Sequence, residues 1–287
     1  MQYSAAIENR KSVRAFLNQE VRREDLQSIR RFYETECHRL VPEIPTELTV
    51  LDLSTRKDLE GAAGYEEALV GAPHYLVLLS GSHPQASENA GFMMEDMLLK
   101  LEEMGLQSCW ITFTDPEKVK AALDLSSSLE VAAIAAFGYG VKQQKKMRLN
   151  IFSMSCVDII AKRGYYAPKK DIRELVFVNE LDNIQGLDER IGFYDDMLWQ
   201  AFYGVSKAPS YLNRQPYAFI LKNQDIVLVK LPDPYTDDRS HALDLGIALL
   251  HFTAVAEQWV GKINWDFSEK QALSLPEGCF AAAVYHM

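Results

Sequence analysis

The sequence predicts an α+β fold that is present twice in one chain of 287 residues. Short apolar segments bounded by turn residues alternate with helical segments, a pattern typical of sheets flanked by helices. A long apolar helix that ends in Gly and is followed by Trp occurs in each half. Gly91 precedes Trp110 by 19 positions, and Gly246 precedes Trp265 by the same 19 positions. The copies lie 155 residues apart, whereas solenoid repeats are about 20–50 residues long. The period therefore indicates a duplicated domain, which commonly reproduces a twofold dimer interface inside one chain as a pseudo-dimer.

The first half opens with two helical segments and two strands. A helix is expected from residue 5 toward the basic cluster that ends at residue 14, and a second over 22–36, where the periodicity is helical. Strands are expected at 46–53 and 75–80, because both are short apolar runs between turn residues.

The rest of the first half contains the first long helix. This helix is expected over 89–105 and ends at Gly105 as a C-cap. Asp115 is a suitable N-cap for a shorter helix, with Pro in its first turn. The expected order is then a strand at 108–113, this helix at 115–124 and a buried strand at 131–140.

The second half repeats this order. A helix over 194–207 is followed by a polar loop and by two strands at 218–223 and 225–231, which an Asn-containing turn separates. A long apolar helix begins near His241 and leads into an expected strand that carries Trp265. The last expected strand is 279–286.

Composition excludes several classes of protein. Apolar residues make up 48% and charged residues 24% of the chain, which is ordinary globular composition. The net charge of −10 argues against a nucleic-acid surface. No apolar run reaches the roughly 18 residues of a membrane span, and the N-terminus does not resemble a signal peptide, so we expect a cytoplasmic protein without a membrane partner. The four cysteines are scattered without metal-ligand spacing, so reduced thiols and no metal site are expected.

A basic cluster near the N-terminus is the first candidate site. Arg10, Lys11 and Arg14 place three cations within five residues, with the hydroxyl of Ser12 between them. Guanidinium groups bind phosphate bidentately, so this set of donors favours an anionic ligand. The alternative is a solvated basic face of a helix.

The polar loop after the helix at 194–207 is the second candidate. Ser210, Asn213 and Gln215 offer both donors and acceptors, which suit the uracil-like edge of a flavin. Pro209 and Pro216 restrict the shape of the loop. The alternative is a plain connector between a helix and a strand, because Ser, Asn and Pro are common turn residues.

A glycine turn after the strand at 131–140 is the third candidate. Gly138 and Gly140 are followed by the cations Lys146 and Arg148, an arrangement that could hold a phosphate. Alone, this pattern is equally typical of a solvated run of charges.

Taken together, the three motifs resemble those of the nitroreductase family. The family opens with an R-R-S-x-R type motif, similar to residues 10–14, and carries A-P-S-x-x-N-x-Q-P-[WY]-x-F, which residues 208–219 match. It also has a long helix ending G-L-G-x-x-W, similar to 105–110, and a G-Y-P turn with a basic K-x-R tail, similar to 138–148. The order differs from the family: here the polar loop lies in the second half and the Arg motif only in the first, as in the two-repeat nitroreductases.

The resemblance implies a mixed, mostly antiparallel sheet flanked by helices, internally duplicated, with halves at 1–165 and 166–287. It also implies one FMN site built from both halves, so that a monomer is sufficient for one site. Arg10, Lys146 and Arg148, with Ser12 and the neighbouring Lys11, would bind the phosphate, and Arg14 would lie near the pyrimidine end of the ring. Ile111 and Thr112 would run over one ring face. Pro209, Ser210, Asn213 and Gln215 would fix the ring from the other half.

The activity that the resemblance implies is ping-pong reduction of a small organic acceptor, such as a nitroaromatic or a quinone, by NADH or NADPH. No catalytic residue is nominated, because the flavin carries the chemistry. The histidines His74, His83, His241, His251 and His286 are interpreted as ordinary surface or core residues. The alternative is a non-catalytic or degenerate flavin-binding protein of the same fold.

Overall fold

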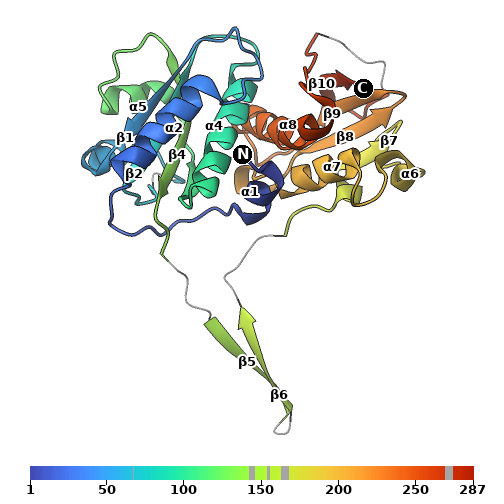
Figure 1. Cartoon of the computed structure of the whole chain (residues 1–287), viewed down its shortest axis with the longest axis horizontal. Coiled ribbons are helices and arrows are strands. Elements are labelled where there is room, and N and C mark those ends of the chain that lie inside the picture. The colour runs from blue at the N-terminus through green and yellow to red at the C-terminus, as the bar shows by residue number, and fades with distance from the viewer. Residues whose placement is uncertain (67, 142–145, 154–155, 163–167, 269–273) are drawn as a thin grey trace.

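The computed structural model of the chain describes residues 1–66, 68–141, 146–153, 156–162, 168–268 and 274–287. For residues 146–162 the description covers the course of the backbone and not the side chains. Two four-stranded sheets and the helices packed on them make up the body of the described chain (Figure 1).

The first sheet is antiparallel and has the order β1-β2-β4-β3. Its strands are β1 (Thr46–Leu51), β2 (His74–Ser80), β3 (Gln107–Ile111) and β4 (Glu130–Gly138). The helices around it are α2 (Arg23–Thr35), α3 (Arg56–Leu59), α4 (Ala86–Glu103) and α5 (Pro116–Ala122), with a short 3-10 turn at Leu53–Thr55. Helix α1 (Tyr3–Asn9) packs on α4 and on helices of the second half, and its Ala6 and Ile7 belong to the core of that half. Every residue of β2 is buried, since Leu76 and Leu78 pack in the core beside α4 and their neighbours pack on the opposite face. A continuous apolar run of this kind is expected of a strand covered on both faces.

The second sheet is mixed and has the order β10-β9-β8-β7. Its strands are β7 (Val176–Val178), β8 (Tyr217–Lys222), β9 (Asp225–Lys230) and β10 (Phe280–His286), and only the β7–β8 pair is parallel. The helices are α6 (Leu187–Ile191), α7 (Met197–Lys207) and α8 (Asp238–Val260), with 3-10 turns at Ile172–Glu174 and Tyr211–Asn213. This sheet confirms the predicted mixed, mostly antiparallel architecture.

The two long helices α4 and α8 cross in the centre of the molecule, between the sheets (Figure 1). A Cβ atom added to Gly91 would lie 2.2 Å from the carbonyl oxygen of Leu243, and one added to Gly246 would lie 1.9 Å from that of Glu88. Each glycine therefore faces the residue three positions before the other one. A twofold axis between the two helices would produce this reciprocal contact. Both glycines of the sequence repeat therefore allow the backbones of α4 and α8 to approach closely.

A second pair of equivalent contacts supports the duplication. The backbone N–H of Val41 donates to Oδ1 of Asn89 on α4 at 3.0 Å, and the backbone N–H of Tyr211 donates to Oδ1 of Asp244 on α8 at 2.9 Å. Asn89 and Asp244 are again 155 residues apart. The order β1-β2-β4 in one sheet likewise matches β8-β9-β10 in the other. The boundaries of the two halves at 165 and 166 stay a prediction.

The structure differs from the predicted elements in several places, among them the short elements α3, α6 and β7, which were not predicted. Helix α1 begins at Tyr3 and ends at Asn9, because the basic segment after it pairs with β3. The expected strand around Trp265 is reduced to one bridge between Asp266 and Val284. Its indole instead donates to the hydroxyl of Thr253 on α8 at 2.9 Å. Residues 146–162 contain the strands β5 (Lys146–Ser153) and β6 (Cys156–Lys162), which pair with each other and lie apart from both sheets (Figure 1).

No described helix combines the length and the apolar content that a membrane crossing requires. The long helices α4 and α8 owe their apolar character to their central position, where most of their circumference is buried.

Candidate functional site

The basic segment after α1 runs along the outer edge of the first sheet. Ser12 bridges Ser108 of β3 in parallel, and the N–H of Val13 donates to the Ser108 carbonyl at 2.9 Å. The segment is therefore extended, and the alternative of a basic helix face is wrong. Arg10 is buried at 9% exposure, whereas Lys11, Ser12 and Arg14 are exposed. The cluster thus divides into one buried cation and a set of exposed donors beside it.

Arg10 reaches across to the centre of α4. Its Nε lies 3.2 Å from Oε1 of Glu95, a carboxylate with no exposed surface. Glu95 also accepts from the indole of Trp110 at 2.8 Å and from Nε2 of His251 at 3.1 Å. Burial alone would raise the pKa of Glu95, but Arg10, His251 and Trp110 together hold that pKa below its usual value. Glu95 is thus an anion at neutral pH.

His251 joins this network to the second half. Its Nδ1 lies 2.9 Å from the carbonyl oxygen of Gly204 on α7, and its other ring nitrogen faces Glu95. Both partners offer acceptor oxygens, so His251 is bound on both sides and links α4, α7 and α8. The network therefore places Arg10 and His251 around one carboxylate.

Two further features concern the cations near Glu95. Nη1 of Arg10 is buried and has no hydrogen-bond partner among the described residues. Lys169 is half-buried nearby, and its Nζ donates to the carbonyl oxygen of Ala208 at 2.9 Å. Burial first, and then the charge of Arg10, lower the pKa of Lys169 to about 8. A buried guanidinium donor without an acceptor is uncommon and indicates an anion that completes the site.

The polar loop of the second half begins at Ala208. Leu212, Asn213 and Gln215 all have positive φ angles, of 48°, 58° and 46°. Residues other than glycine rarely adopt this conformation, and it costs on the order of 1 kcal/mol or more each. Three such residues within four positions argue against a plain connector, because strained backbone of this kind clusters at functional sites.

The loop is held from within and from its neighbours. Gln215 has no exposed surface: its amide donates to the Ser206 carbonyl at 3.1 Å and accepts from the N–H of Lys170 at 2.9 Å. The hydroxyl of Ser210 accepts from the N–H of Gln215 at 2.8 Å, and Asn213 donates to the carbonyl of Pro168 at 2.7 Å. In this structure Gln215 shapes the loop, while Ser210 and Asn213 are only partly buried. Pro209 is buried at the start of the loop.

Asp244 on α8 is the main tether of the loop. It accepts from the backbone N–H of Tyr211 through both oxygens, at 2.9 and 3.1 Å. Burial raises the pKa of Asp244 well above its usual value.

The end of β3 lies near the same loop. Ile111 is buried in the sheet, and the carbonyl of Thr112 accepts from the N–H of Gly64 at 2.7 Å. Burial, and then Tyr65, the residue after Gly64, raise the pKa of Tyr211 in the loop. Arg10 is connected to the second half through Glu95 and His251, which contacts the carbonyl of Gly204 four residues before Ala208. The side chains of Lys146 and Arg148 lie outside the described residues, although the backbone of both belongs to β5.

Sequence reasoning missed Glu95, Lys169 and the bonding of His251. The available signal was charge in an apolar setting: Glu95 and Asp96 interrupt the most apolar stretch of α4, and His251 lies in the apolar centre of α8. A charged residue in such a position is almost always paired, which identifies it as a member of a network.

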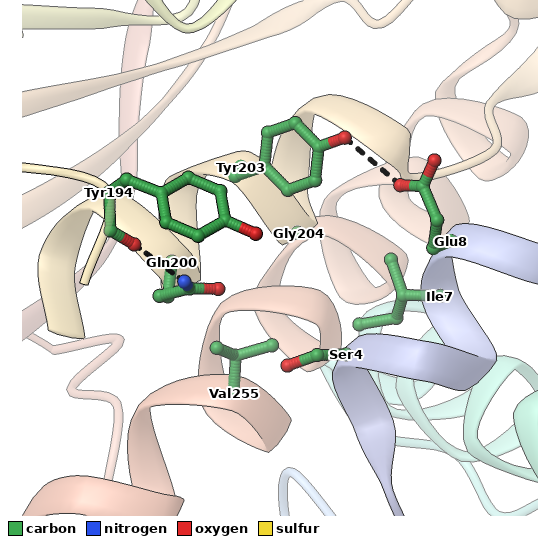
Figure 2. Close-up of a pocket in the computed structure, with 8 residues that line it drawn as sticks. All are labelled: Ser4, Ile7, Glu8, Tyr194, Gln200, Tyr203, Gly204 and Val255. Atoms are coloured by element: carbon green, nitrogen blue, oxygen red, sulfur yellow. Dashed lines mark hydrogen bonds between the residues drawn. The ribbon is translucent and has the colours of Figure 1, made fainter. Parts of the chain in front are cut away.

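Two cavities lie elsewhere and contain none of the predicted site residues. One, of about 390 Å³, lies between α1, α7 and α8, where Glu8 accepts from the hydroxyl of Tyr203 at 3.0 Å (Figure 2). The other, of about 520 Å³, lies beside the C-terminal half of α8 and is lined by His38, Glu257 and Trp265 among others.

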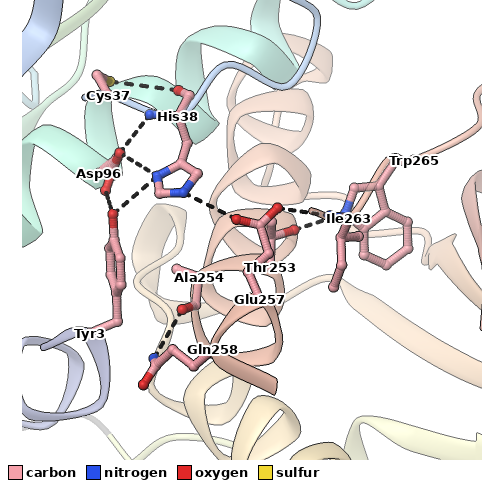
Figure 3. A network of polar contacts seen from close by, with 10 residues as sticks. All are labelled: Tyr3, Cys37, His38, Asp96, Thr253, Ala254, Glu257, Gln258, Ile263 and Trp265. Carbon is pink, nitrogen blue, oxygen red and sulfur yellow. Dashed lines mark hydrogen bonds and ion pairs between the residues drawn. The ribbon is translucent and has the colours of Figure 1, made fainter. Parts of the chain in front are cut away.

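His38 is the centre of a polar network at the second cavity (Figure 3). Its Nδ1 lies 2.9 Å from Asp96 on α4 and 3.0 Å from the Tyr3 hydroxyl, and its Nε2 lies 3.3 Å from Glu257 on α8. The hydrogen bonds to Asp96 and then to Glu257 raise the pKa of His38 to about 10. This network connects the same two helices as the Arg10 network, at a separate place.

Comparison with known proteins identifies the family of this chain. Residues 3–256 match the model of the family described as "Putative TM nitroreductase". The chain belongs to this nitroreductase family. It is accordingly an oxidoreductase, as the motifs predicted. No curated protein matches the sequence.

One solved structure shows the same fold over nearly the whole chain, and others align with about half of it. A putative nitroreductase from Thermotoga maritima aligns with 99% of this chain and 92% of its own, with a TM-score of 0.58 and 18% identity. An FMN-dependent nitroreductase from Clostridium difficile aligns with 48% of this chain and 88% of its own, at a TM-score of 0.41 and 20% identity. A putative NADH oxidase from Clostridium acetobutylicum aligns with 48% of this chain and 89% of its own, at a TM-score of 0.42 and 21% identity.

Proposed function

We propose that this nitroreductase-family chain is an FMN-dependent oxidoreductase that reduces a small organic acceptor at the expense of NADH or NADPH. One observation carries the proposal: buried Arg10, whose Nη1 has no partner among the described residues, is linked through Glu95 and His251 to the end of α7, which leads into the strained 208–216 loop of the other half. A cation that lacks an acceptor, next to a rigid polar loop, suits a ligand with an anionic group and a heterocycle.

The donors present fit FMN. Arg10 would bind the phosphate, with the exposed Lys11 and Ser12 beside it, and Lys146 and Arg148 are proposed to contribute from β5. Burial raises the pKa of Cys109, and the charges of Arg14 and Arg10 oppose this effect. Arg14 would place its guanidinium at the pyrimidine end of the ring. Ser210 and Asn213 would contact the ring edge, Ile111 and Thr112 would lie along one face, and Pro209 and Gln215 would hold the loop.

When bound, FMN would supply two-electron chemistry, taking hydride from NAD(P)H and passing it to an acceptor such as a nitroaromatic or a quinone in a ping-pong cycle. The residues of the chain bind and orient the cofactor and provide a fixed positive field. A phosphate is bound more tightly by a cation that is held in place before binding, and the Glu95 network holds Arg10 in this way.

One chain is proposed to hold one flavin, in a pseudo-dimer of residues 1–165 and 166–287. The reciprocal glycine contacts and the matching tethers of Asn89 and Asp244 support this division. The Arg motif lies only in the first half and the polar loop only in the second, so no further chain is needed to complete the site.

The proposal is tested by the visible spectrum of the purified chain, followed by anaerobic titration with NADH and NADPH. We expect flavin absorbance at about one flavin per chain and bleaching on addition of the nicotinamide. Arg10→Ala and Asn213→Ala should each lower the flavin content, although they change different halves. Arg22→Ala is the matched control, because Arg22 is exposed and its ion pair among the described residues is with the neighbouring Asp25 at 2.8 Å.

Three results would contradict parts of the proposal. Colourless protein that does not bind added FMN would exclude the cofactor. Yellow protein that neither nicotinamide reduces would leave a flavin-binding protein without this activity. A ratio near two flavins per chain would exclude the single composite site.

A further inference from the structure

Lys169 lies where the two halves of the candidate site meet, and it belongs to none of the recognised motifs. Its Nζ donates to the carbonyl of Ala208, the residue at which the polar loop begins. The next residue, Lys170, is bonded through its backbone N–H and its Nζ to Gln215 of the same loop. The position of Lys169 is therefore fixed by the loop on one side.

The charges that face Lys169 come from three helices. Arg10 follows α1, Glu95 lies on α4 and Asp244 lies on α8. After burial, which lowers the pKa of Lys169, Arg10 lowers it further, and the two acidic residues raise it. Glu95 is already shared by Arg10, His251 and Trp110. Burial raises the pKa of Asp244 well above its usual value. Among the described residues, no carboxylate lies within ion-pairing distance of Lys169.

The two cations of this cluster are incompletely paired. Arg10 shares Glu95 with His251 and Trp110, and Lys169 has a carbonyl oxygen as its acceptor. Partly buried cations without a carboxylate of their own are costly unless an anion is bound. The unpartnered Nη1 of Arg10 identifies a donor that such an anion would satisfy.

We propose that Lys169 is a cofactor-binding residue which, together with Arg10, binds the phosphate of FMN. This inference rests on the proposed function and adds a residue from the second half to the phosphate site. Lysine binds phosphate as a point charge, and arginine provides directed donors, so the two side chains complement each other at one anion.

Binding should also change the protonation of Lys169. In the free site, burial and Arg10 lower its pKa to about 8. A bound phosphate opposes both effects and favours the charged form. The affinity for FMN should therefore fall as the pH rises above about 8, because the free chain then loses a proton that the bound chain retains.

The test measures FMN dissociation from the full-length chain as a function of pH. The flavin-loaded chain is diluted between pH 7 and 9.5, and the fluorescence of released flavin gives the dissociation constant. We expect this constant to rise roughly ten- to thirtyfold over this range for the natural sequence. Riboflavin, which lacks the phosphate, should bind with a constant that changes less than about threefold.

Two variants at the same position separate charge from titration. Lys169→Arg keeps the cation but does not titrate, so FMN should still bind well at pH 7 and the pH dependence should disappear. Lys169→Met removes the cation, so the FMN dissociation constant at pH 7 should rise about tenfold or more. Lys207→Met is the matched control: Lys207 lies one residue before Ala208 and pairs with Glu8 at 3.9 Å, and its loss should leave the pH dependence intact.

The inference about Lys169 and the proposed function fail in different ways. If the natural chain binds FMN with no pH dependence, or if Lys169→Arg retains it, the role of Lys169 is refuted while the flavin site stands. Equal pH dependence for riboflavin would refute binding of the phosphate. A natural chain that binds no flavin refutes the proposed function, and the inference with it.

Discussion

Replacement of Gly246 by Ala should separate the two central helices. A Cβ atom on Gly246 would lie 1.9 Å from the carbonyl oxygen of Glu88, whereas ordinary contact begins at 3.4 Å. The helices must therefore move apart by about 1.5 Å (3.4 less 1.9), because the atom in the way belongs to the backbone and has no rotamer to change. Steric overpacking of a core costs about 1–3 kcal/mol, and a rigid backbone contact belongs at or beyond the upper end of that range.

Urea unfolding of the two variants measures this cost. We expect Gly246→Ala to lower the free energy of unfolding by about 3 kcal/mol, although Gly→Ala within a helix otherwise stabilises by roughly 0.5–1 kcal/mol. Gly91→Ala should have a similar effect, since its Cβ would lie 2.2 Å from the Leu243 carbonyl. The double variant should cost less than the sum of the two, because helices already separated by one methyl group accommodate the second.

Gly204→Ala is the matched control. Gly204 is also inside a buried helix, but its added Cβ would lie 3.2 Å from a methyl of Val255 and 3.3 Å from the nearest backbone oxygen. Small adjustments relieve such contacts, so we expect a change within about 1 kcal/mol. Equal losses for Gly204→Ala and Gly246→Ala, or no loss for the latter, would refute the account of the crossing.

Three further predictions concern the polar networks. Glu95→Gln should lower the free energy of unfolding by about 3–5 kcal/mol, because it leaves Arg10 buried without its carboxylate; a near-neutral change in urea unfolding would contradict the network. Protonated His38 should stabilise the fold fully below pH 6.5, its ordinary pKa, and this stabilisation should disappear as the pH rises toward its folded pKa of about 10. The difference in free energy of unfolding between the natural chain and His38→Asn should therefore shrink between these two pH values. A constant difference would be inconsistent with the raised pKa. Asp244→Asn should change stability by less than Asp244→Ala, which leaves the Tyr211 N–H without an acceptor at a cost of about 1–3 kcal/mol; equal losses in thermal unfolding would show that charge and not the hydrogen bond matters.

The elements were predictable wherever a local pattern decides them. Asp115 accepts from the N–H groups of Glu117 and Lys118, as its place before Pro116 predicts. The two long helices were evident from their apolar character. The three-residue strand β7 was not, since it is too short for a period and becomes a strand only by pairing with β8. The prediction of a strand at Trp265 was wrong for a related reason. This segment makes one bridge to β10, and the Trp265 indole binds the hydroxyl of Thr253 on α8.

The candidate site was predictable where its residues are close in sequence. Arg10–Arg14 and the 208–216 loop are continuous motifs, so a resemblance could identify them. The partners of Arg10 could not be found in this way: Glu95 and His251 are separated from each other by 156 positions, and Lys169 has no motif around it. Which buried charges meet is decided by the crossing of α4 and α8, and the sequence alone does not give that geometry.

The ion pair between Glu95 and His251 lies where two copies of one helix would face each other in a symmetric dimer. At the spacing of 155 residues, Glu95 corresponds to Leu250 and His251 corresponds to Asp96. In a homodimer a substitution appears in both subunits. A new carboxylate beside the twofold axis therefore faces the identical carboxylate of the other subunit. A fused chain can change one side only. Glu95 of α4 and His251 of α8 can then meet where the two helices cross. This contact can orient Arg10 of the first half, while the second half has no corresponding basic motif.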